Sequence, residues 1–266
     1  MIDLDRKLFI ENIGELPGGD SGFTGVYAGS AFCQEALPSR GAFEQLVKEA
    51  ASRGLSFTFV TPYLTDTYFD HAFALAELLA TISKGAEVTA NDLGFLVRVA
   101  GEIPDLVPVA GRALAGQRTD PQIPAILEAA FSSGGQADMA GAFGHVSVNK
   151  PGFADFMLER GVRRLEIQNT KQAVSIGSSD FSYSMHSPYV FVSSTRFCPP
   201  VESYVRPGRV AGVYPCSRHC VNRYHRIKPR GSEQEFLYRG NTIYYENPVV
   251  EPPEGVDRLV VHRLPS

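Results

Sequence analysis

Residues 86–110, AEVTANDLGFLVRVAGEIPDLVPVA, decide the fold class because their hydrophobic periodicity changes twice. AEVTA (86–90) and LVPVAGRAL (106–114, the run that begins with LVPVA) are short runs with β-branched residues, and they predict strands. Between them, DLGFLVRVAG carries apolar residues at helical spacing behind Asn91 or Asp92, either of which is a good N-cap. A strand, a helix and a strand joined by short connections predict a parallel β/α unit.

The same alternation extends in both directions along the chain. Strands are predicted at 23–29 and 55–64, with helices over 41–53 after Ser39 and from Thr65 or Asp66 to Lys84 and Gly85. Further on, a helix after Pro151 precedes strands at 162–169 and 188–198. We therefore expect an α/β fold, a TIM-like (β/α) barrel that is either complete or short of eight units, with residues 1–266 forming a single domain.

Two regions depart from this regularity. Residues 111–145 are predicted to be an irregular insertion with a short helix near 123–131, and its small-residue part, 130–144, to be poorly packed or ordered by a partner. The C-terminal part is predicted to be a basic, cysteine-bearing segment followed by a β-hairpin that turns at 239–241.

Composition indicates an ordinary globular chain, 44% hydrophobic and 20% charged. We predict neither a signal peptide nor a membrane span, and we expect a cytoplasmic protein. In a reducing compartment four cysteines favour metal or redox chemistry over structural disulfides. Between Arg206 and Arg230 there are seven Lys or Arg residues and no Asp or Glu, which indicates either a solvated basic face or a binding surface.

The cysteines are the most specific feature of the sequence. Cys33 and Cys198 each follow a predicted strand, and Cys216 and Cys220 form a C-x3-C pair. Because the carboxyl ends of barrel strands converge on one face, these thiols are expected to meet there and bind a metal centre. Their number fits a 4Fe–4S cluster, and the irregular spacing suits a cluster better than a structural zinc. Zinc remains the alternative, and three histidines could replace cysteines in it: His186, His219 and His225.

Other polar residues are weaker candidates for a substrate site. Asn91 and Asp92 follow a strand, although one of them is expected to cap the next helix. Arg112 and Arg118 follow another strand and could bind a carboxylate or phosphate, or be loop charges. Glu166, with Gln168 beside it, ends a strand, although Glu166 could instead pair with Arg163 or Arg164.

Several stretches resemble the U-32 peptidase-like family, and within it the ubiquinone-biosynthesis branch. The likeness covers most of the chain and is carried by GVYAGSAFC, EVTANDLGFLVRV, LVPVAGRALAGQRTDP, PGFADFMLERGVRRLEI and LYRGNTIYY. The order of Cys33, Cys198, Cys216 and Cys220 is similar to the cluster ligands of that branch. No G-x-S-x-G or H-E-x-x-H motif is present, so peptidase activity is not expected.

The resemblance implies an α/β barrel with an oxygen-sensitive 4Fe–4S cluster and a related family member as heterodimer partner. It implies a part in an oxygen-independent hydroxylase complex, acting on a small anionic or aromatic substrate. Two other functions stay open. The chain could modify tRNA or rRNA, with the basic run and Tyr238, Tyr244 and Tyr245 as RNA contacts, or it could be a non-catalytic scaffold stapled by its metal.

Overall fold

A computed structural model describes residues 4–19, 21–132, 143–177, 179–195, 198, 216, 218, 220–221, 223–230 and 233–263. Within them, eight strands, all paired in parallel, close into a barrel in the order β1-β12-β7-β6-β5-β4-β3-β2. Their bounds are β1 Asp5–Ile10, β2 Gly25–Gly29, β3 Ser56–Thr61, β4 Glu87–Ala90, β5 Val107–Ala110, β6 Arg164–Gln168, β7 Ser182–Ser187 and β12 Val256–His262. The expected barrel is confirmed, and it is complete.

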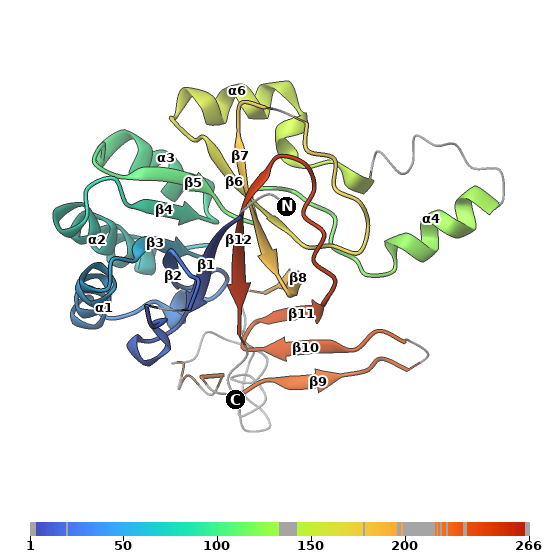
Figure 1. Ribbon diagram of the computed structural model, residues 1–266, viewed down its shortest axis with the longest axis horizontal. Coiled ribbons are helices and arrows are strands. Elements are labelled where there is room, and N and C mark those ends of the chain that lie inside the picture. The colour runs from blue at the N-terminus through green and yellow to red at the C-terminus, as the bar shows by residue number, and fades with distance from the viewer. Residues whose placement is uncertain are drawn as a thin grey trace.

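Four helices pack around the outside of this barrel (Figure 1). They are α1 Arg40–Ser52, α2 Asp66–Ile82, α3 Leu93–Glu102 and α6 Pro151–Glu159. Their starts follow from the sequence, because Ser39 caps α1, Asp92 caps α3 and Pro151 occupies the first turn of α6. The buried face of α1 is formed by Phe43, Leu46, Val47 and Ala50, at the spacing that predicted it. Three short 3-10 helices, η1 Ile13–Glu15, η2 Gln34–Ala36 and η3 Ser147–Asn149, lie in the connections.

Barrel closure uses strands that the sequence pattern did not predict. β1, which no sequence pattern predicted, pairs with both β2 and β12, so β1 near the start and β12 near the end of the sequence lie side by side. β7 has the sequence SYSMHS, whose serines and histidine give no apolar run. It nevertheless lies between β6 and β12, with its polar side chains buried.

A second sheet covers the carboxyl ends of the barrel strands (Figure 1). It is antiparallel, in the order β8-β11-β10-β9, with bounds β8 Tyr189–Ser194, β9 His225–Ile227, β10 Phe236–Arg239 and β11 Thr242–Glu246. The predicted hairpin is confirmed as β10 and β11. The run 188–198 was expected to be a barrel strand, and this expectation was wrong. An apolar strand of this length suits either sheet, and β8 pairs with the hairpin instead.

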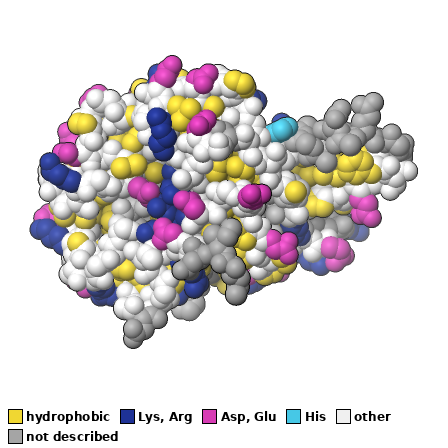
Figure 2. Space-filling view, turned by 45° about the horizontal axis from the view of Figure 1, so that its top comes forward, with side chains coloured by type: hydrophobic (Ala, Val, Ile, Leu, Met, Phe, Trp, Pro, Cys, Tyr) yellow, Lys and Arg dark blue, Asp and Glu magenta, His cyan; other side chains and the backbone are white. Residues whose placement is uncertain are grey.

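The insertion contains α4, Ile123–Ser132, which projects away from the barrel as an arm (Figures 1 and 2). Ile126 and Phe131 are exposed on it, as expected for a segment with little core of its own. Most of the stretch 130–144, predicted to be poorly packed, lies outside the described residues. In the described part of the chain, we find no helix long and apolar enough to cross a bilayer.

Candidate functional site

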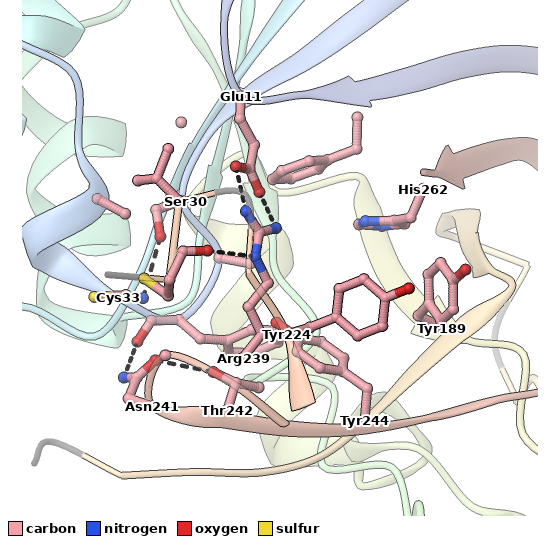
Figure 3. A pocket seen from close by; sticks show the side chains of 18 of the residues that line it. Glu11, Ser30, Cys33, Tyr189, Tyr224, Arg239, Asn241, Thr242, Tyr244 and His262 are labelled. Carbon is pink, nitrogen blue, oxygen red and sulfur yellow. Dashed lines mark hydrogen bonds and ion pairs between the residues drawn. The ribbon is translucent and has the colours of Figure 1, made fainter. Parts of the chain in front are cut away.

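A pocket of about 360 Å³ opens between the barrel and the second sheet. Its wall includes the segment from Gly29 to Cys33 after β2, the β1 end at Phe9 and Glu11, and His262 at the end of β12. The opposite wall comes from the β10–β11 hairpin and from Cys220, Val221 and Tyr224 (Figure 3). This is the carboxyl end of the barrel strands, where (β/α) barrels place their sites.

Three of the four cysteines interact electrostatically at this pocket. Cys33 and Cys220 line it, and Cys216 lies within electrostatic range of both. Burial chiefly raises the pKa of the Cys33 thiol to about 11; the charges of Cys220 and Cys216 contribute to this rise, and hydrogen bonds from the backbone of Glu35 and Ala36 oppose it. The fold therefore brings a residue after β2 together with residues more than 180 positions later along the chain.

Specific contacts attach the C-x3-C pair to the barrel. Arg239 donates from Nε to the carbonyl of Cys220 at 3.1 Å and forms a bidentate ion pair with Glu11, with Nη2 to Oε2 at 2.6 Å (Figure 3). Arg218 donates from Nη2 to the carbonyl of Leu37 at 3.0 Å. A Cβ at Gly240 would lie 3.3 Å from Sγ of Cys220, so glycine lets the hairpin approach this sulfur.

Two contacts near these thiols are of a kind that iron–sulfur sites use. The backbone N–H of Arg218 donates to Sγ of Cys216 at 3.3 Å, and hydrogen bonds of this kind stabilise and tune cluster sulfurs. Arg239, whose charge acts on Cys220, would offset the negative charge of a thiolate-ligated cluster. Within the residues that can be described, no three His, Cys, Asp or Glu side chains are grouped to hold a metal ion. All four cysteines are among the described residues, and the half-buried Cys198 does not line the pocket with Cys33 and Cys220, so the four-cysteine site stays a prediction.

A line of buried polar side chains runs from the barrel interior to the pocket. Thr89 donates from Oγ1 to Glu166 Oε1 at 2.8 Å, and Glu166 Oε2 lies 3.1 Å from Nε2 of His186. Nδ1 of His186 lies 2.7 Å from Nε2 of His262, so one ring donates a proton and the other accepts it. His262 lines the pocket and stacks on Phe9, with ring centroids 4.7 Å apart.

Burial determines where protons reside along this line. It raises the pKa of Glu166 to about 7, while the charge of Arg112 opposes that rise. Burial and repulsion from Arg112 hold the pKa values of His186 and His262 well below the ordinary value for histidine. Below about pH 7 the carboxyl of Glu166 therefore holds a proton while the two imidazoles are neutral, and near pH 7 this carboxyl changes its protonation state.

Arg112, predicted from its place after a strand, lines the pocket and is 4% exposed. Its guanidinium lies over the ring of Phe32, 4.8 Å from the centroid. Nε and Nη1 are buried and have no hydrogen-bond partner among the described residues. An uncompensated buried guanidinium is costly, which marks this residue for a role other than stability.

The other predicted residues do not line the pocket. Asn91 is fully buried and joins neighbouring strands, donating to the carbonyl of Thr61 and accepting from the N–H of Ala113, each at 2.9 Å. Asp92 caps α3 by accepting from Phe95 N at 3.0 Å. Arg118 is exposed. Glu166 lies in the barrel interior and reaches the pocket through the two histidines.

The sequence pattern did not indicate His262 or Arg239 and assigned Tyr244 to RNA, and all three line the pocket. His262 ends a strand that was not predicted, although the alternating run VDRLVVH was a usable signal. The tyrosines expected to stack on RNA are placed differently. Tyr245 is fully buried and Tyr244 faces the pocket, so neither forms an exposed stacking surface.

The structure also shows how the basic run is paired and where the histidines of the alternative zinc site lie. Arg226 and Lys228 pair with Glu235 and Glu233, so part of the basic run is neutralised. His186 is engaged by His262 inside the barrel, which removes it as a zinc ligand beside the cysteines. His225 is exposed on β9, and His219 lies outside the described residues.

Comparisons with known proteins add one structural likeness. No protein-family model matches the sequence, and no curated protein matches it. A similar solved structure is described as "The Structure of the U32 Peptidase Mk0906". It has 14% sequence identity and a TM-score of 0.48, over 98% of this chain and 92% of that chain. At this distance, function has to be inferred from the side chains of the chain itself.

Proposed function

We propose that the chain is the 4Fe–4S cluster-binding component of an oxygen-independent hydroxylation system of the ubiquinone-biosynthesis type, a role like that of UbiV. A related U-32 family protein is its heterodimer partner. The proposal is supported chiefly by one observation. Cys33 interacts with Cys216 and Cys220 at the rim of a pocket that is large enough for a small substrate.

The four ligands in this proposal are Cys33, Cys198, Cys216 and Cys220. When bound, the cluster would supply one-electron chemistry beside the pocket. Other residues of the chain position the cysteine-bearing segments beside the pocket. Ser30 accepts from the N–H of Cys33 at 3.1 Å and orders the turn that presents this thiol. Arg239 and Arg218 fix the second sheet and the C-x3-C segment against the barrel.

The barrel wall of the pocket also supplies a group for substrate, His262 (Figure 3). His262 presents a neutral imidazole that bonds to His186, whose Nε2 lies 3.1 Å from the carboxyl of Glu166, a group that is protonated below about pH 7. A proton can therefore be held at, and delivered to, an atom in the pocket without direct contact with bulk water. Hydroxylation of a ring requires such proton movement, because the carbon that gains oxygen must lose its hydrogen.

The competing functions have less support. RNA modification required exposed tyrosines, and Tyr245 is in the core. A scaffold stapled by metal would need no ligand pocket, whereas here the pocket is lined by both the barrel and the second sheet. Zinc in place of the cluster is distinguished directly by metal analysis.

The test is metal retention in cysteine variants prepared without oxygen. Cys33→Ala, Cys198→Ala, Cys216→Ala and Cys220→Ala should each lose most of the iron and sulfide that the wild-type chain carries. The barrel should stay folded in each, because it has its own core. Ile227→Ala, on the same second sheet and exposed, is the matched control and should retain full iron. Full iron and sulfide in any of the four cysteine variants would contradict the assignment of that ligand.

A further inference from the structure

We infer that the pocket binds the carboxylate of a small aromatic acid, with the guanidinium of Arg112 as its anchor and the surrounding aromatic rings as its walls. Binding itself needs only the pocket, although the ligand's role as a substrate rests on the proposed function.

Arg112 is suited to bind an anion because its buried guanidinium has N–H groups without hydrogen-bond partners among the described residues. Its side chain is buried, and Nε and Nη1 have no partner among the residues that are described. Its guanidinium carbon lies over the ring of Phe32, 4.8 Å from the centroid, and this cation–π contact holds the group in place without using its N–H hydrogen bonds. A buried, oriented and unpaired guanidinium is complementary to an anion, and its fork of N–H groups matches the two oxygens of a carboxylate.

Neighbouring acids do not already satisfy this charge. In the described part of the chain no carboxylate lies within ion-pair distance of Arg112, and its nearest acidic influence, Glu166, is bonded to Thr89. Four arginines but only two glutamates line the pocket. Glu11 is paired with Arg239, and Glu15 accepts from Asn12 and from the N–H of Glu11. The pocket is therefore positively charged overall and attracts an anion.

The aromatic residues that line the pocket determine which group the ligand carries beside its carboxylate. Phe9, Phe32, Tyr189, Tyr224 and Tyr244 contribute five aromatic rings to a cavity of about 360 Å³. That volume is at the small end for ligand pockets and admits a single substituted ring. Aromatic walls favour a flat ring through offset or edge contacts, whereas a fully hydrated, doubly charged phosphate gains little from them. The tyrosine hydroxyls and His262 can bond a polar substituent on that ring.

Binding is tested with benzoate as the probe on the full-length chain, prepared without oxygen and assayed for iron in the same sample. Ligand-observed NMR and calorimetry would compare benzoate with phenol, acetate and inorganic phosphate at equal concentrations. We expect saturable binding of benzoate and at least about tenfold weaker binding of phenol and acetate, because each lacks one of the two recognised groups.

Two substitutions locate the anchor. Arg112→Met should weaken benzoate binding by about 10- to 100-fold, as loss of a charge-assisted pair does. The same variant should melt at a higher temperature than the wild-type chain, because an unpaired buried charge has been removed. Arg112→Lys should bind benzoate at an intermediate level. Arg118→Met, an exposed arginine outside the pocket, should bind as the wild type does.

Benzoate binding and iron retention are measured separately, so failure of this inference can be told from failure of the proposed function. Equal binding of benzoate by the wild type and Arg112→Met, or tighter binding of phosphate than of benzoate, would overturn the inference while iron retention is unaffected. An iron-free wild-type chain that still binds benzoate through Arg112 would support this inference and contradict the proposed function.

Discussion

Nδ1 of His186 and Nε2 of His262 lie 2.7 Å apart, across the pairing of β7 with β12 that helps to close the barrel. Neither strand was predicted from the sequence, yet together they connect a buried carboxyl, Glu166, to the pocket. At this end of the barrel, the interior therefore contains a chain of titratable side chains, Glu166, His186 and His262, as well as apolar core residues.

The first prediction concerns the pH dependence of stability. The pKa of Glu166 is raised to about 7 in the folded chain from an ordinary 4.5, so the folded state binds the extra proton between these values. Stability from this group is therefore present below pH 4.5 and is lost as the pH rises toward 7. Relative to the wild type, Glu166→Gln should gain roughly 3 kcal/mol in free energy of unfolding over that window.

Urea denaturation at several pH values measures this difference. His186 and His262 titrate in both proteins, so their contribution largely cancels in the comparison. Glu77→Gln, on the exposed face of α2, is the control and should follow the wild-type curve. A gain in stability that is independent of pH would show that Glu166 is ionised throughout.

The second prediction concerns Gly29, which lines the pocket at the end of β2. Its φ is +123°, and a Cβ there would lie 2.2 Å from the carbonyl oxygen of Val60. Gly29→Ala should therefore cost about 2 kcal/mol or more in unfolding free energy, through strain and displacement of β3. Gly41→Ala, in α1 with open space around it, should stabilise by about 0.5–1 kcal/mol. Thermal denaturation of both variants checks the pair, and equal effects would contradict the strain argument.

The sequence predicted the parts of the fold in which local patterns and tertiary structure agree. The units from β2 to β5 have apolar strands and helices with cap residues; Ser39 caps α1 as predicted, and of the two candidates Asn91 and Asp92 the cap of α3 is Asp92. β7 was not predicted because its buried polar side chains replace an apolar run and bond to other parts of the barrel, Ser184 to Arg164 and His186 to His262. β8 was assigned to the wrong sheet, since periodicity does not encode the partner of a strand.

The same distinction applies to the site. Cys33 and Arg112 were correctly placed at the carboxyl end of the barrel because each follows a strand. His262, Arg239 and Tyr244 reach the pocket only through long-range pairing of the chain ends and of the hairpin, which no local pattern reports. Asn91 looked like a candidate for the same reason as Arg112, but its amide bonds adjacent strands.

The third prediction concerns the clamp between Arg239 and Glu11. This ion pair and the bond from Arg239 to the carbonyl of Cys220 attach the hairpin to the barrel end. Arg239→Gln should therefore increase amide hydrogen exchange in β10 and β11 by about tenfold or more, and it should leave β3 to β5 unchanged.

A double-mutant cycle with Glu11→Gln provides the control for this clamp. The two single variants and the double variant should show a coupling of about 1–2 kcal/mol, as a partly buried bidentate pair does. Strictly additive effects would mean that the hairpin is held to the barrel by other contacts.

The most direct test of the proposed function is iron, sulfide and zinc analysis of the wild-type chain purified without oxygen, together with Mössbauer spectroscopy of the same sample. The account predicts about four iron and four sulfide per chain, no zinc, and the spectrum of a single 4Fe–4S cluster, all lost on exposure to air. A chain that is folded but holds zinc, or holds no metal after anaerobic reconstitution with iron and sulfide, would contradict it.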